Sequence, residues 1–144
     1  KLYKFIENVP FSVGMNNHQG SVATSNNDYM NTFMKILSNT SLYFIDSITT
    51  PNSVAYKYAE KYGIQALKRD IFLDNKNNYD YINNMFERAL YITNKYGEVI
   101  VIAHVTKSNT FKFISNLALS NNDIIESNID FVNTTDMLNI KSIR

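Results

Sequence analysis

Two histidines and a set of aspartates are the side chains of this sequence best suited to chemistry. His18 and His104 are the two histidines of the chain, and Asp46, Asp70 and Asp74 each adjoin a short apolar run. Since the chain holds no cysteine, disulfides, thiolate metal sites and cysteine nucleophiles are excluded. Imidazole and carboxylate groups transfer protons and bind divalent ions such as zinc. The residue types therefore point to acid–base or metal-assisted chemistry.

Short apolar runs alternate along the chain with longer segments of helical period, which is typical of βα units around a parallel sheet. The expected strands are Phe11–Asn16, Leu42–Ile45, Ile64–Leu67 and Val99–Ala103, with a last short strand near Asp130–Asn133. The expected helices run from Asn27 to Ser38, from Thr50-Pro51 to Gly63, from Tyr79 to Tyr96, and from Asn109 to Ser120. Gly63 and Gly97 suit left-handed caps at the ends of two of these helices. The pattern predicts an α/β fold, either part of a β/α barrel or an open doubly wound sheet.

Ligands of such folds bind at the carboxyl ends of the parallel strands, which share one edge of the sheet. That rule selects residues after each expected strand, namely Asn16, Asn17 and His18, then Asp46 and Ser47, then Arg69, Asp70 and Asp74, and finally His104. We expect His18, Asp46, Asp70 and His104 to line a common pocket. Two imidazoles together with carboxylates would suit a divalent-ion site.

The same residues also have structural explanations. Residues 16–20 suit a tight turn, because Asn and Gly accept left-handed backbone angles. Asp46 suits a cap for the following segment, and Asp74 suits a turn before a helix. Arg69 and Asp70 are adjacent and suit solvated charges. For His104, a hydrogen-bonded structural role is the alternative to a functional one.

Length and charge limit the classes of function. The chain has 144 residues, which predicts a single domain over 1–144. Its 14 Lys and Arg are scattered and balanced by 13 Asp and Glu, so no basic stripe marks it as a nucleic-acid binder. The longest apolar run, Val99–Ala103, is too short to span a membrane. Four glycines form no phosphate-binding loop, and no Gly-x-Ser-x-Gly elbow accompanies a catalytic triad.

Several segments together resemble a known family, the divergent polysaccharide deacetylase or YibQ-like family. They occur in the family's order and cover the chain from about Phe11 to Met137. They are Val13-Gly14-Met15-Asn16-Asn17-His18-Gln19-Gly20-Ser21, Tyr43-Phe44-Ile45-Asp46-Ser47 with Thr49-Thr50-Pro51, Ser53-Val54-Ala55-Tyr56, Arg69-Asp70-Ile71-Phe72-Leu73-Asp74-Asn75 and Ile102-Ala103-His104.

This resemblance implies a NodB-like deformed β/α barrel with parallel strands, of which the chain would cover the carboxyl-terminal part. It implies a metal-dependent hydrolase that removes acetyl groups from polysaccharide or peptidoglycan. The expected metal is a divalent ion, zinc by the resemblance, and the expected location is periplasmic or extracellular. His18 then corresponds to a metal-binding histidine. His104 corresponds to a metal ligand or to the general acid, and Asp70 or Asp74 to the carboxylate that orients it.

The remaining rim residues, Asn16, Asn17, Asp46, Ser47 and Arg69, are the candidates for substrate binding. The resemblance also implies that an acidic metal ligand and the catalytic base belong to an earlier strand that this chain does not show.

The chain departs from the family at Ile48, where the family has arginine, and at Val105, where it has proline. These departures keep open the alternative of a non-catalytic cell-envelope barrel protein that binds glycan or a protein partner. A third alternative, a cytoplasmic β/α protein without a metal, would be favoured if the full gene lacked an export signal.

Overall fold

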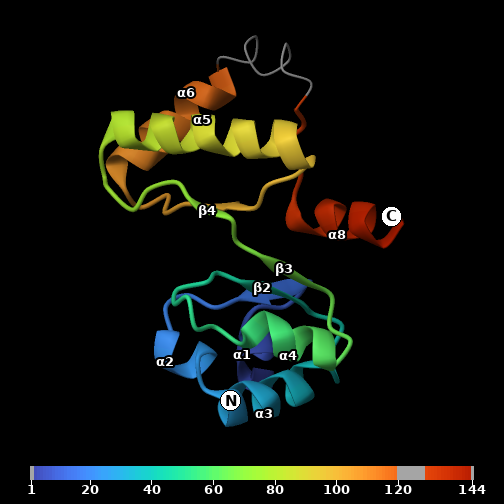
Figure 1. Ribbon diagram of the computed structural model, residues 1–144. Helices are drawn as coiled ribbons and strands as arrows, with labels where there is room; N and C mark the ends of the chain where they lie inside the picture. The colour runs from blue at the N-terminus through green and yellow to red at the C-terminus, as the bar shows by residue number, and fades with distance from the viewer. Residues whose placement is uncertain (1, 120–128, 144) are drawn as a thin grey trace. The chain divides into compact units, whose positions relative to one another are not determined.

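The computed structural model describes residues 2–119 and 129–143, which divide into two compact units (Figure 1). The first unit comprises residues 1–68 and 133–144, and the second comprises residues 69–132. Both units contain parallel strands and helices, which confirms the predicted α/β class. The assignment of the whole chain to a single domain stays a prediction.

The sheet of the first unit has three parallel strands in the order β1-β2-β3. These strands are β1 (Gly14–Asn16), β2 (Tyr43–Asp46) and β3 (Ala66–Lys68). Phe44 of β2 is paired with Met15 on one side and Ala66 on the other, and only 2% of its surface is exposed. The first three predicted strands and their parallel arrangement are therefore confirmed, although β1 and β3 are shorter than predicted and β2 begins and ends one residue later.

Helices cover this sheet, and α3 supplies much of the core. The helices of the first unit are α1 (Leu2–Asn8), α2 (Ser21–Thr24), α3 (Asn27–Leu37), α4 (Ala55–Lys61) and α8 (Thr134–Ile143). Asn26 begins α3 as a side-chain cap that accepts a bond of 2.9 Å from the Tyr29 N–H. Met30, Met34 and Leu37 follow at helical spacing and are buried. Figure 1 shows α3 and α4 on the same side of the sheet.

The start of α4 differs from the prediction. The sequence predicted a helix capped at Thr50, but α4 begins at Ala55. The Asp46 carboxylate at the end of β2 accepts hydrogen bonds from the Ser53 hydroxyl at 2.7 Å and from the Tyr56 N–H at 3.3 Å. Asp46 thus satisfies an N–H in the first turn of α4 from a neighbouring strand, and the helix starts where that carboxylate can reach it.

Gly14 has a packing role in the first sheet. A Cβ at this position would lie 2.2 Å from the ring of Tyr43, its register partner on β2. That ring is held in place, because the Tyr43 hydroxyl lies 2.6 Å from the Thr134 hydroxyl at the start of α8. Only glycine therefore fits at position 14 without a shift of the ring.

We predict that Gly14→Ala lowers the free energy of unfolding by about 1–3 kcal/mol, the usual cost of overpacking. In a Tyr43→Ala background, where the ring is gone, the same Gly14→Ala change should cost much less. Urea unfolding of the wild type, Gly14→Ala, Tyr43→Ala and the double variant measures the difference. Equal costs in both backgrounds would show that the ring does not restrict position 14.

The second unit pairs two short parallel strands, β4 and β5. Its elements are β4 (Ile71–Phe72), α5 (Tyr79–Tyr96), β5 (Val101–Ile102) and α6 (Ser108–Leu119). Asn78 caps the start of α5 and Gly97 ends it with a left-handed backbone. Ile82 and Phe86 of α5 pack with Phe113 of α6 in the core of this unit. The predicted helices and the fourth predicted strand are confirmed here.

Two elements at the carboxyl-terminal end and in the middle of the chain were predicted wrongly. No strand forms at residues 130–133; instead Asn133 caps α8 by accepting a 3.0 Å bond from the Asp136 N–H. The stretch that holds β4 was expected to be part of the connection that follows the third predicted strand, but it forms a strand that pairs with β5. Helices α1, α2 and α8 were not predicted. None of the helices in the described part of the chain is long and apolar enough to cross a membrane.

Candidate active site

The register of β4 and β5 brings Asp74 to His104. Ile71 pairs with Val101 and Phe72 with Ile102, a constant separation of 30 positions. Both strands then continue in step, since the Leu73 N–H bonds to the Ile102 carbonyl at 3.0 Å. Two residues past the last strand pair, the same separation places position 74 beside position 104. A local pairing of two strands therefore assembles two of the predicted site residues.

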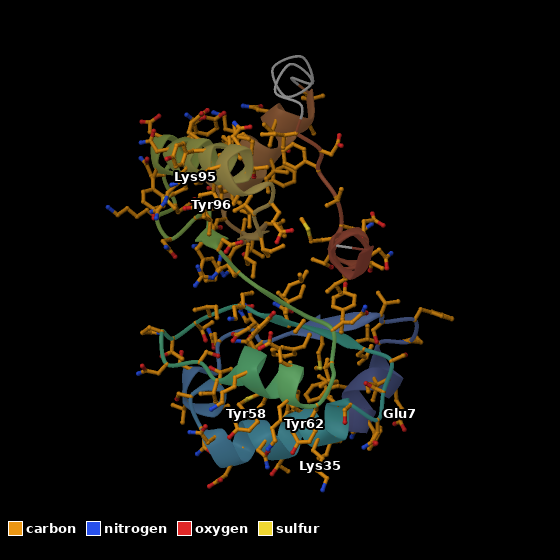
Figure 2. All side chains as sticks on the ribbon, turned by 45° about the vertical axis from the view of Figure 1, so that its right-hand side comes forward. Glu7, Lys35, Tyr58, Tyr62, Lys95 and Tyr96 are labelled. Atoms are coloured by element: carbon orange, nitrogen blue, oxygen red, sulfur yellow. The ribbon has the colours of Figure 1, made fainter. Side chains whose placement is uncertain are left out.

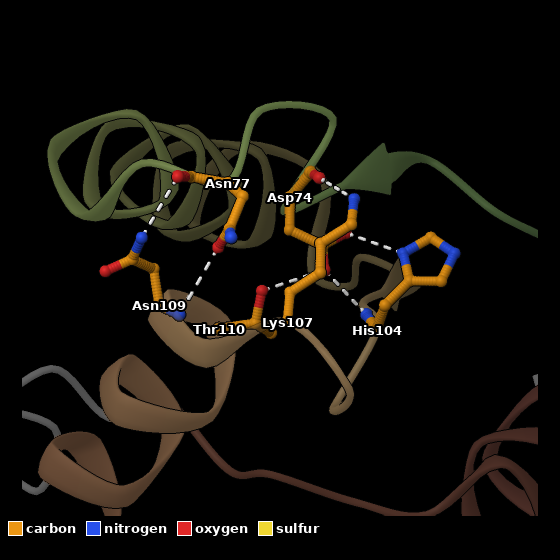
Figure 3. Close-up of polar contacts among 6 residues, drawn as sticks. All are labelled: Asp74, Asn77, His104, Lys107, Asn109 and Thr110. Carbon is orange, nitrogen blue, oxygen red and sulfur yellow. Dashed lines mark hydrogen bonds and ion pairs between the residues drawn. The ribbon is translucent and has the colours of Figure 1, made fainter.

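Asp74 is the centre of a hydrogen-bond network (Figure 3) and none of its side chain is exposed. Its Oδ1 lies 3.0 Å from Nδ1 of His104. Its Oδ2 accepts from the backbone N–H of His104 at 2.7 Å and from the Thr110 hydroxyl at 2.8 Å. The Lys107 ammonium donates to the Asp74 backbone carbonyl and lies 3.9 Å from Oδ1. Every buried side-chain polar atom in the described residues has a partner, so this network is fully satisfied.

The contact through Nδ1 fixes how His104 can react. A carboxylate facing Nδ1 favours a proton on that nitrogen, so Nε2 becomes the nitrogen that exchanges protons with a substrate. The His104 side chain is 34% exposed, whereas that of Asp74 is fully buried. A surface imidazole that is hydrogen-bonded to a buried carboxylate occurs in two kinds of site: catalytic acid–base pairs and metal sites with a histidine ligand.

The loop after β4 and the start of α6 are tied together next to this pair. The Asn109 backbone N–H donates to the Asn77 side-chain oxygen at 3.3 Å, and the Asn109 side chain donates to the Asn77 carbonyl at 3.0 Å (Figure 3). These bonds join the turn that follows Asp74 to the helix that carries Thr110. The turn after Asp74 and the start of α6 therefore both fix the position of the groups around the Asp74 carboxylate.

Asp70 lies at the other end of the strand pair and has a different partner. Its Oδ2 accepts from the Ile100 N–H at 2.8 Å, and its own N–H donates to the Ile100 carbonyl at 2.9 Å. Of the two aspartates that the sequence proposed to orient His104, the structure places Asp74 in contact with it. The Arg69 guanidinium, another predicted site residue, lies over the ring of Phe72 at 4.4 Å.

Phe72, Lys107 and Thr110 were not singled out from the sequence. Phe72 is the last residue of β4 and lies two residues before Asp74. Lys107 and Thr110 flank the start of the helix that follows His104. The sequence signal that could have identified them is that they lie close to Asp74 or His104 along the chain. That signal is useful only when it is known that Asp74, and not Asp70, contacts His104.

The pKa of the Asp74 carboxyl lies below its ordinary value. Burial by itself raises this pKa, but hydrogen bonds from the side chain and backbone of His104 and from Thr110, with the charge of His104, lower it further than burial raises it. The ionised carboxylate is thus favoured in the folded protein.

A lowered pKa in the folded state makes stability depend on pH. The stabilising contribution of ionised Asp74 is complete above the unfolded-state pKa of about 3.9, and it is lost as the pH falls through the lower folded-state pKa. We therefore predict that the free energy of unfolding of the wild type declines more steeply below about pH 4 than that of Asp74→Asn. Urea unfolding across the acid range measures both curves, and parallel curves would contradict the prediction.

In the first unit, hydrogen bonds join the loops that follow β1 and β2. The Asn16 amide donates to the Ser47 hydroxyl at 3.3 Å, and the Ser47 N–H donates to the Asn17 side-chain oxygen at 2.9 Å. His18 is exposed beside them and contributes to the lining of a cavity of 140 Å³ together with Asn16 and Asn17. The structure thus groups four of the predicted rim residues within this unit. A pocket shared with residues of the second unit stays a prediction.

The buried Asp46 carboxylate stabilises the loop that follows β2. Its side chain is fully buried, and its Oδ1 accepts from the Ile48 N–H at 2.9 Å, in addition to its bonds to the start of α4. Ile48 has a φ of 46° and Gln19 a φ of 60°, left-handed values that are unusual for side chains other than Gly and Asn. The Thr49 hydroxyl joins the two loops by donating to the Gln19 carbonyl at 3.2 Å. Asp46 therefore caps the segment that follows it, as one of the two interpretations of the sequence predicted. Its role in substrate binding stays a prediction.

The donor set for a metal ion is incomplete within the described residues. No three His, Cys, Asp or Glu side chains among residues 2–119 and 129–139 come together in a group that could hold an ion. His18 offers an imidazole and His104 is backed by Asp74, but each is one nitrogen donor. These residues alone do not fit a complete zinc site.

The sequence matches a known family over almost its entire length. Residues 1–138 match the divergent polysaccharide deacetylases, and the chain belongs to this family. The predicted family membership is therefore confirmed.

Two curated relatives and one solved structure support the same placement. The chain is 40% identical over 99 residues to the uncharacterized protein YibQ of Escherichia coli K12, covering 69% of this chain and 31% of YibQ. It is also 40% identical over 93 residues to an uncharacterized protein of Haemophilus influenzae, covering 65% of this chain and 33% of that protein. The chain thus spans about a third of the length of these relatives.

The crystal structure of the uncharacterized protein ATU2773 from Agrobacterium tumefaciens C58 has a similar fold, with a TM-score of 0.69 at 17% identity. The similarity covers 76% of this chain and 44% of that one. At this level of identity the likeness concerns the fold alone, and it supports the α/β assignment.

Proposed function

We propose that this chain provides the acid–base part of a metal-dependent deacetylase that removes N- or O-acetyl groups from a polysaccharide or peptidoglycan. The observation that carries the proposal is the buried Asp74 carboxylate bonded to Nδ1 of the half-exposed His104. Membership in the divergent polysaccharide deacetylase family supports the substrate class. We also propose, from the family membership alone, a periplasmic or extracellular location.

His104 would act as the general acid in amide hydrolysis. The oxygen of one water molecule bonds to the acetyl carbon, the bond from that carbon to the sugar nitrogen breaks, and the nitrogen leaves as an amine after taking the proton on Nε2 of His104. The water would lose one proton to a catalytic base outside this chain, and transfer of a proton from that base back to His104 would restore the imidazolium and leave one acetic acid and one amine as products. Asp74 stabilises the imidazolium and holds its orientation, as carboxylates do in histidine-dependent hydrolases.

The polar rim of the first unit supplies groups for the sugar. Asn16, Asn17 and Ser47 present amide and hydroxyl groups, which are the hydrogen-bonding partners that sugar hydroxyls require. Arg69, in the second unit, offers a guanidinium donor. Asp46 would support this surface indirectly, because its carboxylate is buried and holds the loop at Ile48.

A divalent ion, with zinc as the expected metal, would take the His18 imidazole as one ligand. His104 would be a second ligand only in place of its role as general acid, because Nδ1 faces Asp74 and Nε2 cannot do both. Since the described residues assemble no group of three, the remaining ligands would come from elsewhere in a longer protein. Calorimetric titration with zinc tests this part: the full-length protein should bind the ion, and its His18→Ala form should bind it more weakly. Equal affinity in both would remove His18 from the site.

Acetate release tests the function itself. The protein should release acetate from N-acetylated chitin oligomers or from acetylated peptidoglycan, measured by an enzyme-coupled acetate assay. An absence of release from both substrates by zinc-loaded full-length protein would favour the alternative of a non-catalytic envelope protein that binds glycan or a protein partner.

A further inference from the structure

Phe72 lies directly against the proposed general acid. Its ring is stacked on the His104 imidazole with the ring centres 5.7 Å apart and the planes only 3° from parallel. The two residues come from adjacent positions of the strand pair, since Phe72 is the register partner of Ile102, two residues before His104. Asp74 follows Phe72 by the same two residues. β4 and the turn directly after it therefore present the aromatic ring and the carboxylate to the same imidazole.

The two contacts restrain different motions of His104. The bond from Asp74 to Nδ1 fixes which edge of the imidazole faces the carboxylate, but it permits the ring to tilt about the line that joins the two atoms. A parallel ring at stacking distance opposes that tilt, because tilting gives up the aromatic contact. With both contacts in place, the direction of Nε2 is determined.

The Phe72 ring also contacts a cation, the guanidinium of Arg69. The Arg69 guanidinium lies over the same ring at 4.4 Å. The charged groups nearest the imidazole within this unit include Asp74, whose carboxylate contacts it, and Lys107, which bonds to Asp74. An aromatic face attracts cations, which accounts for the guanidinium over this ring.

From this geometry we propose that Phe72 is a positioning residue, which fixes the plane of the His104 imidazole so that Nε2 points at the leaving nitrogen of the substrate. The inference rests on the proposed deacetylase function for its catalytic consequence. The stacking itself is independent of that function and can be measured separately.

Imidazole NMR spectra provide that separate measurement, because the chain contains only His18 and His104. The carbon-bound protons of His104 should carry a ring-current shift that disappears in Phe72→Leu and in Phe72→Met, and remains in Phe72→Tyr. The signals of His18 are the internal control and should stay in place. Phe72 is only partly buried, and the use of two aliphatic replacements guards against the failure of one to fold. Unchanged His104 signals in both aliphatic variants would overturn the proposal.

The catalytic consequence is read from acetate release. Phe72→Leu should lower kcat by about tenfold with little change in KM, and Phe72→Tyr should restore most of it, because misdirection of the acid affects the reaction more than binding. An undiminished kcat in Phe72→Leu would overturn the positioning role. If the wild type itself releases no acetate while the ring-current shift behaves as expected, the proposed function fails and the stacking of His104 on Phe72 stands.

Discussion

Replacing Asp74 with alanine should lower the free energy of unfolding by about 3–5 kcal/mol, the range typical of removing one partner from a buried charged network. The change leaves the His104 backbone N–H and the Thr110 hydroxyl without their acceptor in a buried position. It also removes the counter-charge of Lys107 and opens a cavity where the side chain was fully buried. Urea unfolding at neutral pH measures the loss.

Asp70→Ala is the matched control for this prediction. Asp70 is exposed, and its carboxylate accepts one bond, from the Ile100 N–H. Its removal should cost about 1 kcal/mol, the usual net value of one hydrogen bond. If both alanine variants lose the same stability, the buried network does not have the central role that the structure gives it.

Replacing His104 with glutamine should reduce kcat for acetate release by about 10²–10⁴, the range associated with general acid–base groups. Glutamine retains a polar side chain of similar length but cannot deliver a proton at neutral pH. Because the imidazole is half-exposed, the fold should tolerate this change better than Asp74→Ala. Steady-state kinetics and urea unfolding, performed on the same preparations, separate the two effects.

Lys95→Gln serves as the control for activity. Lys95 is exposed near the end of α5, and its ammonium lies over the Tyr96 ring at 5.1 Å (Figure 2). Its removal changes the charge of the same unit without touching the proposed site, so kcat should stay at the wild-type level. A His104→Gln protein as active as Lys95→Gln would mean that His104 transfers no proton in the reaction.

Much of the fold was predictable because local patterns determine it. The spacing of Met30, Met34 and Leu37 predicted α3, and Gly97 marked the end of α5. The elements that were missed depend on contacts that are distant in sequence. The start of α4 depends on Asp46 of β2, and the short β4 forms because β5 pairs with it. A sequence pattern does not contain that information.

The candidate site was predictable in its residue types and only partly in its contacts. The rule that ligands bind at strand ends selected His104 and both aspartates, but the choice between Asp70 and Asp74 required the strand register. Phe72, Lys107 and Thr110 resemble ordinary core or surface residues until Asp74 is placed. The role of Asp46 as a buried cap was one of two readings that the sequence left open.

A double-mutant cycle on kcat for acetate release tests most directly whether Asp74 and His104 form one catalytic pair. The four proteins are the wild type, Asp74→Asn, His104→Gln and the double variant, with Asp74→Asn chosen because it keeps the shape of the side chain. If the pair acts as a unit, the double variant should be no slower than His104→Gln, since Asp74 works only through the imidazole. Losses that multiply in the double variant would show that the two residues act independently and would contradict the account.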